Sequence, residues 1–221
     1  MKIIKNFISK EDQKEVLAYL EICKDFIHKS SDIKWKPTVG QGGIYCKLRS
    51  LPHNETIIKI RNKIINTYNL QYAPTPSAHF EDFINLVPPG GNIGSHQDID
   101  PDFLHPNLDL SLFNPRSSKF IHSPENKEKL QEYINWVKSQ NNGEGINITN
   151  HLRFNVLIQL PCKGGKNIYN DEILEVEERD LIEYRPDLNY HGCTENEGKK
   201  ERVNLSFGFI KSGGIFKKYV E

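Results

Sequence analysis

The chain has 221 residues, and its 29 basic and 29 acidic side chains give a formal net charge of zero. This balance gives no electrostatic reason to expect a nucleic-acid backbone or an anionic membrane as the default partner. Hydrophobic residues make up 37% of the sequence, and no apolar run approaches the roughly 18–20 residues of a membrane span. We therefore expect a single domain over residues 1–221 that is cytoplasmic and has no membrane partner. Frequent Asn, Ile and Lys residues suggest a viral or microbial origin.

The spacing of the cysteines argues against a fold that is held together by disulfides or by structural zinc. The four of them lie far apart and form no C-x-x-C pair: Cys23, Cys46, Cys162 and Cys193. This spacing is not typical of a structural zinc site or of a disulfide framework. We expect reduced thiols that are mostly buried.

The first 77 residues are predicted to form a helical support. Ser9-Lys10-Glu11-Asp12 is typical of a capping box, in which the two end side chains bond to backbone N–H groups at the start of a helix. Behind it, four residues share one helical face: Val16, Leu20, Cys23 and Ile27. A second helix is predicted to begin near Asn54, with four residues on its buried face: Ile57, Ile60, Ile64 and Tyr68.

Residues 78–210 are predicted to form a mainly β core. Short strands are predicted at 79–87, 153–160, 173–177, 180–184 and 202–210, and such spacing favours a sandwich or barrel over a parallel α/β sheet. In the second of these strands, four residues are expected on one face: Phe154, Val156, Ile158 and Leu160. An insertion at about 99–150, with a helix predicted from 124 to 139, separates two of the strands. Long insertions of this kind often form lids or binding surfaces.

His96-Gln97-Asp98 is the first candidate metal site. On a strand, residues i and i+2 point to the same side, so both ligand atoms can meet one ion. An imidazole and a carboxylate suit divalent iron, and one further histidine completes a two-histidine, one-carboxylate triad. In a chain with eight histidines, a short motif of this kind also arises by chance.

Two later features carry polar groups beside predicted strands. His191 follows the 180–184 strand after a short turn, where it would project into a barrel mouth or serve as an ordinary loop residue. Alternation in the 202–210 strand places Arg202, Asn204 and Ser206 on one face and apolar residues on the other. A polar inner face is costly unless it binds something. An arginine fork suits the carboxylate of a small dicarboxylate, and a solvated edge strand is the alternative.

In order and spacing, His96-x-Asp98, His191 and Arg202 resemble the iron(II)/2-oxoglutarate-dependent dioxygenase superfamily over about residues 78–210. The resemblance also includes Gly164-Gly165 after the 153–161 segment and Asp180 before the strand that leads to His191. It implies a double-stranded β-helix (jelly-roll) core with flanking helices. It further implies iron(II) as the metal, with 2-oxoglutarate and O2 as co-substrates. The residues it assigns are His96, Asp98 and His191 as metal ligands, and Arg202, Asn204 and Asn85 as 2-oxoglutarate-binding residues.

Two branches of that superfamily share features with the chain. The spacing of Asn85 and His96-Gln97-Asp98, and the 202–207 strand, are similar to AlkB-type nucleic-acid demethylases. Val87 and Gly208, however, stand where that branch usually has a tyrosine and a second arginine. The 153–161 strand with its glycine pair, and Phe7-Ile8-Ser9 before a helix, resemble prolyl-hydroxylase-type oxygenases. That branch usually carries lysine at the position of Arg202.

These features are compatible with three functions. The leading one is a dioxygenase that hydroxylates a protein or peptide side chain, with proline favoured, while 2-oxoglutarate is decarboxylated to succinate and CO2. The second is an AlkB-like demethylase or nucleobase oxygenase with nucleic acid as its partner. The third is a non-catalytic jelly-roll binding module. The neutral charge tilts the choice modestly toward a protein or peptide substrate, and no side chain is assigned as a catalytic base; the oligomeric state is left unpredicted.

Overall fold

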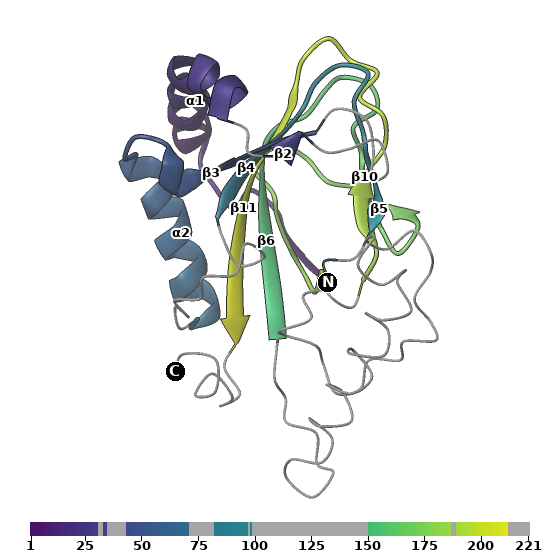
Figure 1. Ribbon diagram of the computed structural model, residues 1–221. Helices are drawn as coiled ribbons and strands as arrows, with labels where there is room; N and C mark the ends of the chain where they lie inside the picture. The colour runs from purple at the N-terminus through teal and green to yellow at the C-terminus, as the bar shows by residue number, and fades with distance from the viewer. Residues whose placement is uncertain are drawn as a thin grey trace, which may run out of the picture.

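The computed structural model describes residues 1–30, 33–34, 43–70, 82–96, 98, 150–186 and 189–211 (Figure 1). The helix predicted at 124–139 and the insertion around it lie outside these residues. Two antiparallel sheets face one another, and two α-helices cover the outer face of the larger sheet (Figure 1). The predicted class, mainly β with flanking helices in a jelly-roll core, is confirmed.

Both helices begin where the sequence indicates. In α1 (Lys10–Ser30), the Asp12 N–H donates to Ser9 Oγ (3.0 Å) and the Ser9 N–H donates to Asp12 Oδ2 (3.3 Å), which is the predicted capping box. In α2 (Glu55–Tyr68), the Asn54 side chain accepts a hydrogen bond from the Ile57 N–H (2.9 Å). Neither helix, among the residues the structure describes, is apolar over a length that could cross a bilayer.

Among the described residues, seven strands form the larger sheet, in the order β1-β9-β6-β11-β4-β3-β2, and four form the smaller one, in the order β5-β10-β7-β8. The larger sheet consists of β1 (Lys2–Ile4), β2 (Ile33–Lys34), β3 (Ile44–Lys47), β4 (Phe83–Val87), β6 (Asn150–Gln159), β9 (Leu181–Tyr184) and β11 (Arg202–Lys211). The smaller sheet consists of β5 (Ile93–His96), β7 (Asn167–Tyr169), β8 (Glu172–Ile173) and β10 (His191–Cys193). Hydrogen-bonded neighbours such as β11 and β4 lie far apart in the sequence, as in a double-stranded β-helix.

The larger sheet divides its residues between a core and a cavity. Val203, Leu205, Phe207 and Phe209 of β11 are buried in one cluster with the apolar faces of α1 and α2. Because strand residues alternate between faces, Arg202, Asn204 and Ser206 point to the opposite side, toward the smaller sheet. This confirms the alternation predicted for the strand and places the main hydrophobic core between the sheet and the helices.

A β-bulge changes the alternation of β6. Asn204 pairs with Leu157 and Val203 pairs with Gln159, so Ile158 is an extra residue in the ladder. Beyond this point the faces exchange, and Leu160 packs with Leu157 on the cavity side of the sheet. The prediction that Leu160 shares the face of Phe154, Val156 and Ile158 is therefore wrong, because a pure period of two does not allow for the inserted residue.

Several short strands differ from the sequence analysis. The helical support predicted for residues 1–77 also contributes β1, β2 and β3 to the larger sheet. Of the strand predicted at 173–177, only Ile173 lies in a strand, as the second residue of β8 (Glu172–Ile173). The strand predicted at 79–87 is described from Phe83 onward. Strands of two to four residues have too few positions for a periodic pattern to reveal them.

The thiols agree with the expectation for a reduced protein. Cys23, Cys46 and Cys193 are buried and Cys162 is exposed, and none of these four described residues forms a disulfide.

A buried carboxylate connects the N-terminal segment to the larger sheet through hydrogen bonds. Asp180, which directly precedes β9, is 1% exposed. It accepts hydrogen bonds from the backbone N–H groups of Asn6 (3.0 Å) and Glu177 (2.8 Å) and from Lys5 Nζ (2.9 Å). These bonds satisfy a charge that would otherwise be costly to bury.

Replacing Asp180 with Ala should therefore lower the free energy of unfolding by about 2–3 kcal/mol, because two backbone donors lose their acceptor. Lys5→Ala is the matched control. The Lys5 side chain is half-exposed, so its loss should cost less than about 1 kcal/mol. Urea denaturation measures both values. Equal losses in the two variants would contradict this account.

Candidate active site

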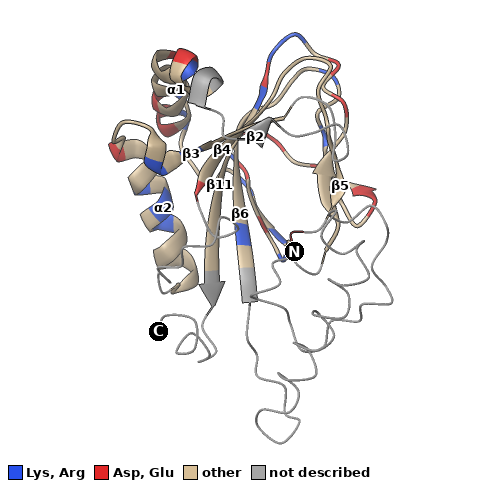
Figure 2. Ribbon diagram, in the orientation of Figure 1, with Lys and Arg blue, Asp and Glu red and all other residues tan. Residues whose placement is uncertain are grey.

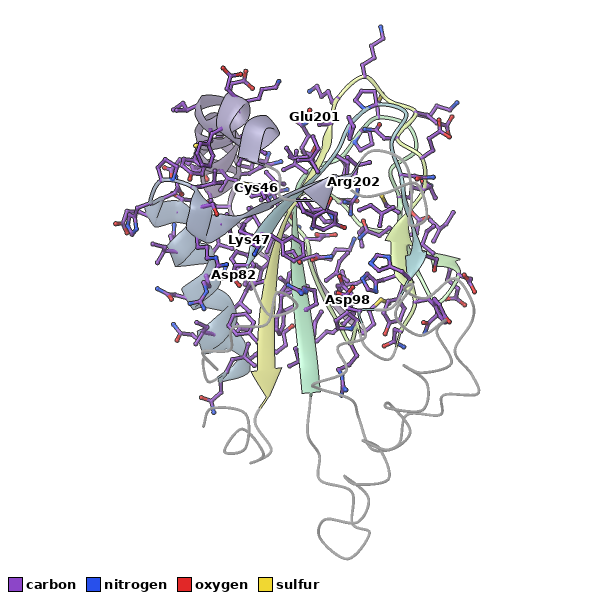
Figure 3. All side chains as sticks on the ribbon, viewed as in Figure 1. Cys46, Lys47, Asp82, Asp98, Glu201 and Arg202 are labelled. Atoms are coloured by element: carbon purple, nitrogen blue, oxygen red, sulfur yellow. The ribbon has the colours of Figure 1, made fainter. Side chains whose placement is uncertain are left out.

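A cavity of about 190 Å³ lies between the two sheets. Inner-face side chains of β3, β4, β6, β9 and β11 line it on the larger sheet, and side chains of β5, β7 and β10 line it on the smaller sheet. Both Asp98 and Arg202 line the cavity, and they lie toward opposite ends of it (Figure 3). The cavity thus joins two groups of polar residues, one around Asp98 and one around Arg202.

Two histidines from neighbouring strands meet Asp98. His96 ends β5 and pairs in register with His191, which begins β10. Their ring centroids are 4.3 Å apart. Asp98 Oδ1 lies 3.4 Å from His96 Nε2 and 3.8 Å from His191 Nε2. The three ligand atoms are within 4.8 Å of one another, close enough to bind one metal ion.

Backbone carbonyls orient both imidazole rings. His96 Nδ1 lies 2.8 Å from the Gly94 carbonyl oxygen, and His191 Nδ1 lies 3.3 Å from that of Asn189. A carbonyl can only accept, so each Nδ1 carries a proton and each Nε2, the atom that a metal would take as its ligand, faces Asp98. This is the support that metal-binding histidines usually have. Two neutral imidazoles and one carboxylate suit a divalent transition metal such as iron(II).

The charges of the three groups are strongly linked. Burial lowers the pKa of His191 to about 4, with the neighbouring His96 contributing. Burial also acts to lower the pKa of His96, but the hydrogen bond and charge of Asp98 outweigh it and raise that pKa. Burial opposes the ionisation of Asp98, yet His191, His96 and Arg153 hold its pKa well below the usual value. Asp98 therefore favours the protonated form of His96 when no metal is bound.

Arg202 is buried at the other end of the cavity, with 2% of its surface exposed. Its Nη1 donates to Asn204 Oδ1 (2.7 Å) and its Nη2 donates to Asn167 Oδ1 (2.8 Å). Both partners are neutral, and its Nε is buried with no hydrogen-bond partner in the part of the chain that the structure describes. No carboxylate of the described residues forms an ion pair with it. A buried cation without a matching charge is costly, so this geometry suits an anionic ligand.

The glycine pair 164–165 packs close to Arg202. A Cβ on Gly165 would lie 2.6 Å from Pro161 Cγ and 3.5 Å from Arg202 Cδ. A Cβ on Gly164 would lie 2.0 Å from the Glu195 carbonyl oxygen. Both residues have positive φ values, 68° and 59°. Only glycine permits this conformation together with such close packing beside Arg202.

Two predicted co-substrate residues face the same cavity. Asn85 of β4 and Asn204 of β11 are directly paired across the strands, and both are buried. Asn85 Oδ1 and Asn204 Nδ2 have no hydrogen-bond partner among the described residues. Buried polar atoms are rarely left unsatisfied, so these two atoms indicate a polar ligand. The structure thus brings all six predicted site residues to one cavity, and their roles there stay predictions.

Several polar residues that line the cavity were not predicted from the sequence, among them Asn167, Arg153, Asn155 and Tyr184. Arg153 stacks over the Phe83 ring at 4.8 Å, and Asn155 Nδ2 donates to the Tyr184 hydroxyl (3.0 Å). The alternation rule applied to Arg202 would also have placed Arg153 and Asn155 on the inner face of β6. For Asn167 the only signal was its position two residues after the glycine pair.

By sequence, the chain matches no protein-family model and no curated protein. By fold, it is similar to a Pseudomonas putida prolyl-4-hydroxylase (TM-score 0.56, 13% identity, 96% of this chain and 92% of that one). It is also similar to a viral collagen prolyl hydroxylase from Paramecium bursaria Chlorella virus-1 in complex with 2-oxoglutarate (TM-score 0.51, 12% identity, coverage 95% and 94%). A third is a Trichoplax adhaerens prolyl hydroxylase in complex with a hypoxia-inducible-factor peptide (TM-score 0.54, 10% identity, coverage 95% and 83%). These likenesses show that the fold is that of the prolyl hydroxylases.

Metal affinity should fall as the pH is lowered through the range around the pKa of His96, which lies above the ordinary histidine value. Metal can bind only after His96 loses its proton, and its pKa is raised. Below that pKa the affinity should fall by about tenfold per pH unit. His191 adds no further dependence in this range, because its pKa is about 4. Calorimetric titration with cobalt(II) at several pH values measures the slope. An affinity that is flat over this range, or that rises toward acid, would contradict the proposed charge state.

Proposed function

We propose that the chain is an iron(II)/2-oxoglutarate-dependent dioxygenase that hydroxylates a protein or peptide side chain, with proline the favoured target. The observation that carries the proposal is one cavity with a His/Asp/His cluster at one end and an unmatched buried arginine at the other. A metal site alone is compatible with many functions. A metal site that shares its cavity with a carboxylate-binding group is far more restrictive.

The residues at the metal end fit iron(II). His96, Asp98 and His191 would hold the ion and, as only three protein ligands, would leave further coordination positions to small molecules. Bound iron, with 2-oxoglutarate and O2, would supply the oxidation: one oxygen atom enters the substrate C–H bond and the other enters succinate as CO2 is released. The protein binds and orients these molecules and keeps water away from them.

At the other end, Arg202 would bind the distal carboxylate of 2-oxoglutarate. Its unpartnered Nε–H and the remaining Nη protons form the fork that a carboxylate accepts in bidentate fashion. Asn204 Nδ2 and Asn85 Oδ1 would contribute a neutral donor and acceptor beside it. The aliphatic side chains of Leu174 and Ile182 also line the cavity, and they suit the methylene carbons of this co-substrate.

The substrate class is argued from the fold and from charge. The similar structures are prolyl hydroxylases, and one of them is in complex with a peptide. In the described part of the chain, basic and acidic residues are interspersed along the helices and loops (Figure 2). A nucleic-acid enzyme would be expected to gather basic residues over one face. We therefore place peptide oxidation ahead of nucleobase oxidation, while the cavity beside Arg202 argues against a non-catalytic module.

Succinate formation from 2-oxoglutarate should depend on iron(II) and on His96. In His96→Ala the rate of succinate formation should fall by more than roughly 100-fold. Losing a residue that hydrogen-bonds to a metal ligand already costs up to about 100-fold in activity, and losing the ligand itself should cost more. His53→Ala is the matched control, since His53 is an exposed histidine paired with Glu55, and it should retain the activity. Proline-containing peptides should increase the rate at which 2-oxoglutarate is converted to succinate.

Mass spectrometry of the peptide pool identifies the hydroxylated residue. Stimulation by single-stranded oligonucleotides instead of peptides would transfer the proposal to the nucleobase branch. Succinate release that needs no iron, or that survives in His96→Ala, would contradict the proposal itself.

A further inference from the structure

Asn167 links the two sheets at the Arg202 end of the cavity. We propose that Asn167 is a positioning residue for Arg202, and that through this contact it sets which dicarboxylate the cavity accepts. The inference rests on the proposed function, in which Arg202 binds the co-substrate carboxylate. Asn167 is not among the site residues predicted from the sequence.

The geometry fixes the plane of the guanidinium. Asn204 Oδ1 holds Nη1 from the same strand, β11, and Asn167 Oδ1 holds Nη2 from β7 of the opposite sheet. With one acceptor on each side, the group cannot rotate without breaking a buried hydrogen bond. A lysine ammonium lacks this rigid fork and could not reproduce both contacts in the same geometry. The two amides therefore explain why arginine suits this position.

These two bonds also determine which donors remain. No described residue accepts a hydrogen bond from the buried Nε atom, and each Nη atom has donated one of its two protons. Nε–H and a neighbouring Nη–H together form the edge that binds a carboxylate through two parallel hydrogen bonds. The contact with Asn167 thus leaves Nε–H and one proton of Nη2 available to the ligand.

The neutrality of Asn167 is as important as its position. An amide oxygen accepts the hydrogen bond but leaves the positive charge of Arg202 unmatched. A carboxylate at the same position would pair with the guanidinium and remove the reason for an anion to bind there. The residue is 6% exposed, so water would screen such a pair only weakly.

The strand that carries Asn167 also relates Arg202 to the metal end. Asn167 pairs with Cys193, and Tyr169 pairs with His191. Asn167, which holds Arg202, and Tyr169, which lies opposite the proposed metal ligand His191, are two residues apart on β7. This spacing corresponds to about 7 Å along the strand. 2-Oxoglutarate has a three-carbon chain between its carboxylates. A homologue with one more carbon, 2-oxoadipate, should fit less well as long as Asn167 holds the guanidinium in place.

Three variants of the full chain test the inference: Asn167→Asp, Asn167→Ala and Asn62→Asp. The last is the matched control, because it makes the same chemical change at an exposed position on α2. The measurements are calorimetric dissociation constants for 2-oxoglutarate and 2-oxoadipate with cobalt(II)-loaded protein, and the thermal midpoint without either ligand.

Asn167→Asp should weaken 2-oxoglutarate binding by more than roughly 100-fold, because the new carboxylate occupies Arg202. Its thermal midpoint should stay equal or rise, since a new ion pair replaces a neutral hydrogen bond. Asn167→Ala should weaken binding by roughly tenfold and reduce the preference for 2-oxoglutarate over 2-oxoadipate. Asn62→Asp should match the wild type in both respects.

Two results would overturn the inference while leaving the proposed function intact. One is an Asn167→Asp protein that binds 2-oxoglutarate within a few-fold of the wild type. The other is a parallel loss of binding and thermal stability in both Asn167 variants with an unchanged preference, which would indicate a merely structural role. A wild-type protein that does not bind 2-oxoglutarate would instead refute the proposed function, and this inference with it.

Discussion

The buried positive charge of Arg202 is the constraint on which the account of this molecule depends. Folding removes the guanidinium from water, yet the described residues supply it with two amide oxygens and no carboxylate. A protein bears such a cost when a ligand supplies the missing charge. The His96, Asp98 and His191 cluster in the same cavity has the complementary property, since it offers ligands for a cation. Together the two ends define a ligand that carries carboxylate groups and reaches a metal ion.

One strand shows how the fold creates this arrangement. The alternate residues of β11 bury Val203, Leu205 and Phe207 against the helices and present Arg202, Asn204 and Ser206 to the cavity. The same hydrogen-bonded ladder therefore holds the hydrophobic core and the proposed co-substrate site. The metal end depends on the smaller sheet, where the pairing of β5 with β10 brings His96 opposite His191. The chemistry thus requires both sheets, and Asn167 is the described side chain that bonds to Arg202 across them.

The sequence predicted the parts that local periodicity and a known residue order determine. Both helices, the two faces of β11 and the His/Asp/His and Arg202 groupings belong to this class. Contacts that depend on tertiary pairing were not predicted. Asn167 lies on a three-residue strand, and its partner is 35 positions away, so no pattern in the sequence links them. The bulge at Ile158 is likewise a consequence of pairing with β11, and it moved Leu160 to the other face of the sheet.

The most direct test of the central claim is the visible absorption spectrum of the protein under anaerobic conditions, titrated with iron(II) and then with 2-oxoglutarate. A 2-oxo acid that chelates iron(II) gives a charge-transfer band that neither component gives alone. The account predicts a band that appears only when protein, iron and 2-oxoglutarate are all present, that saturates at one iron per chain, and that is absent in Asp98→Ala. A spectrum that stays colourless with the wild-type protein would contradict the claim that this cavity holds both groups together.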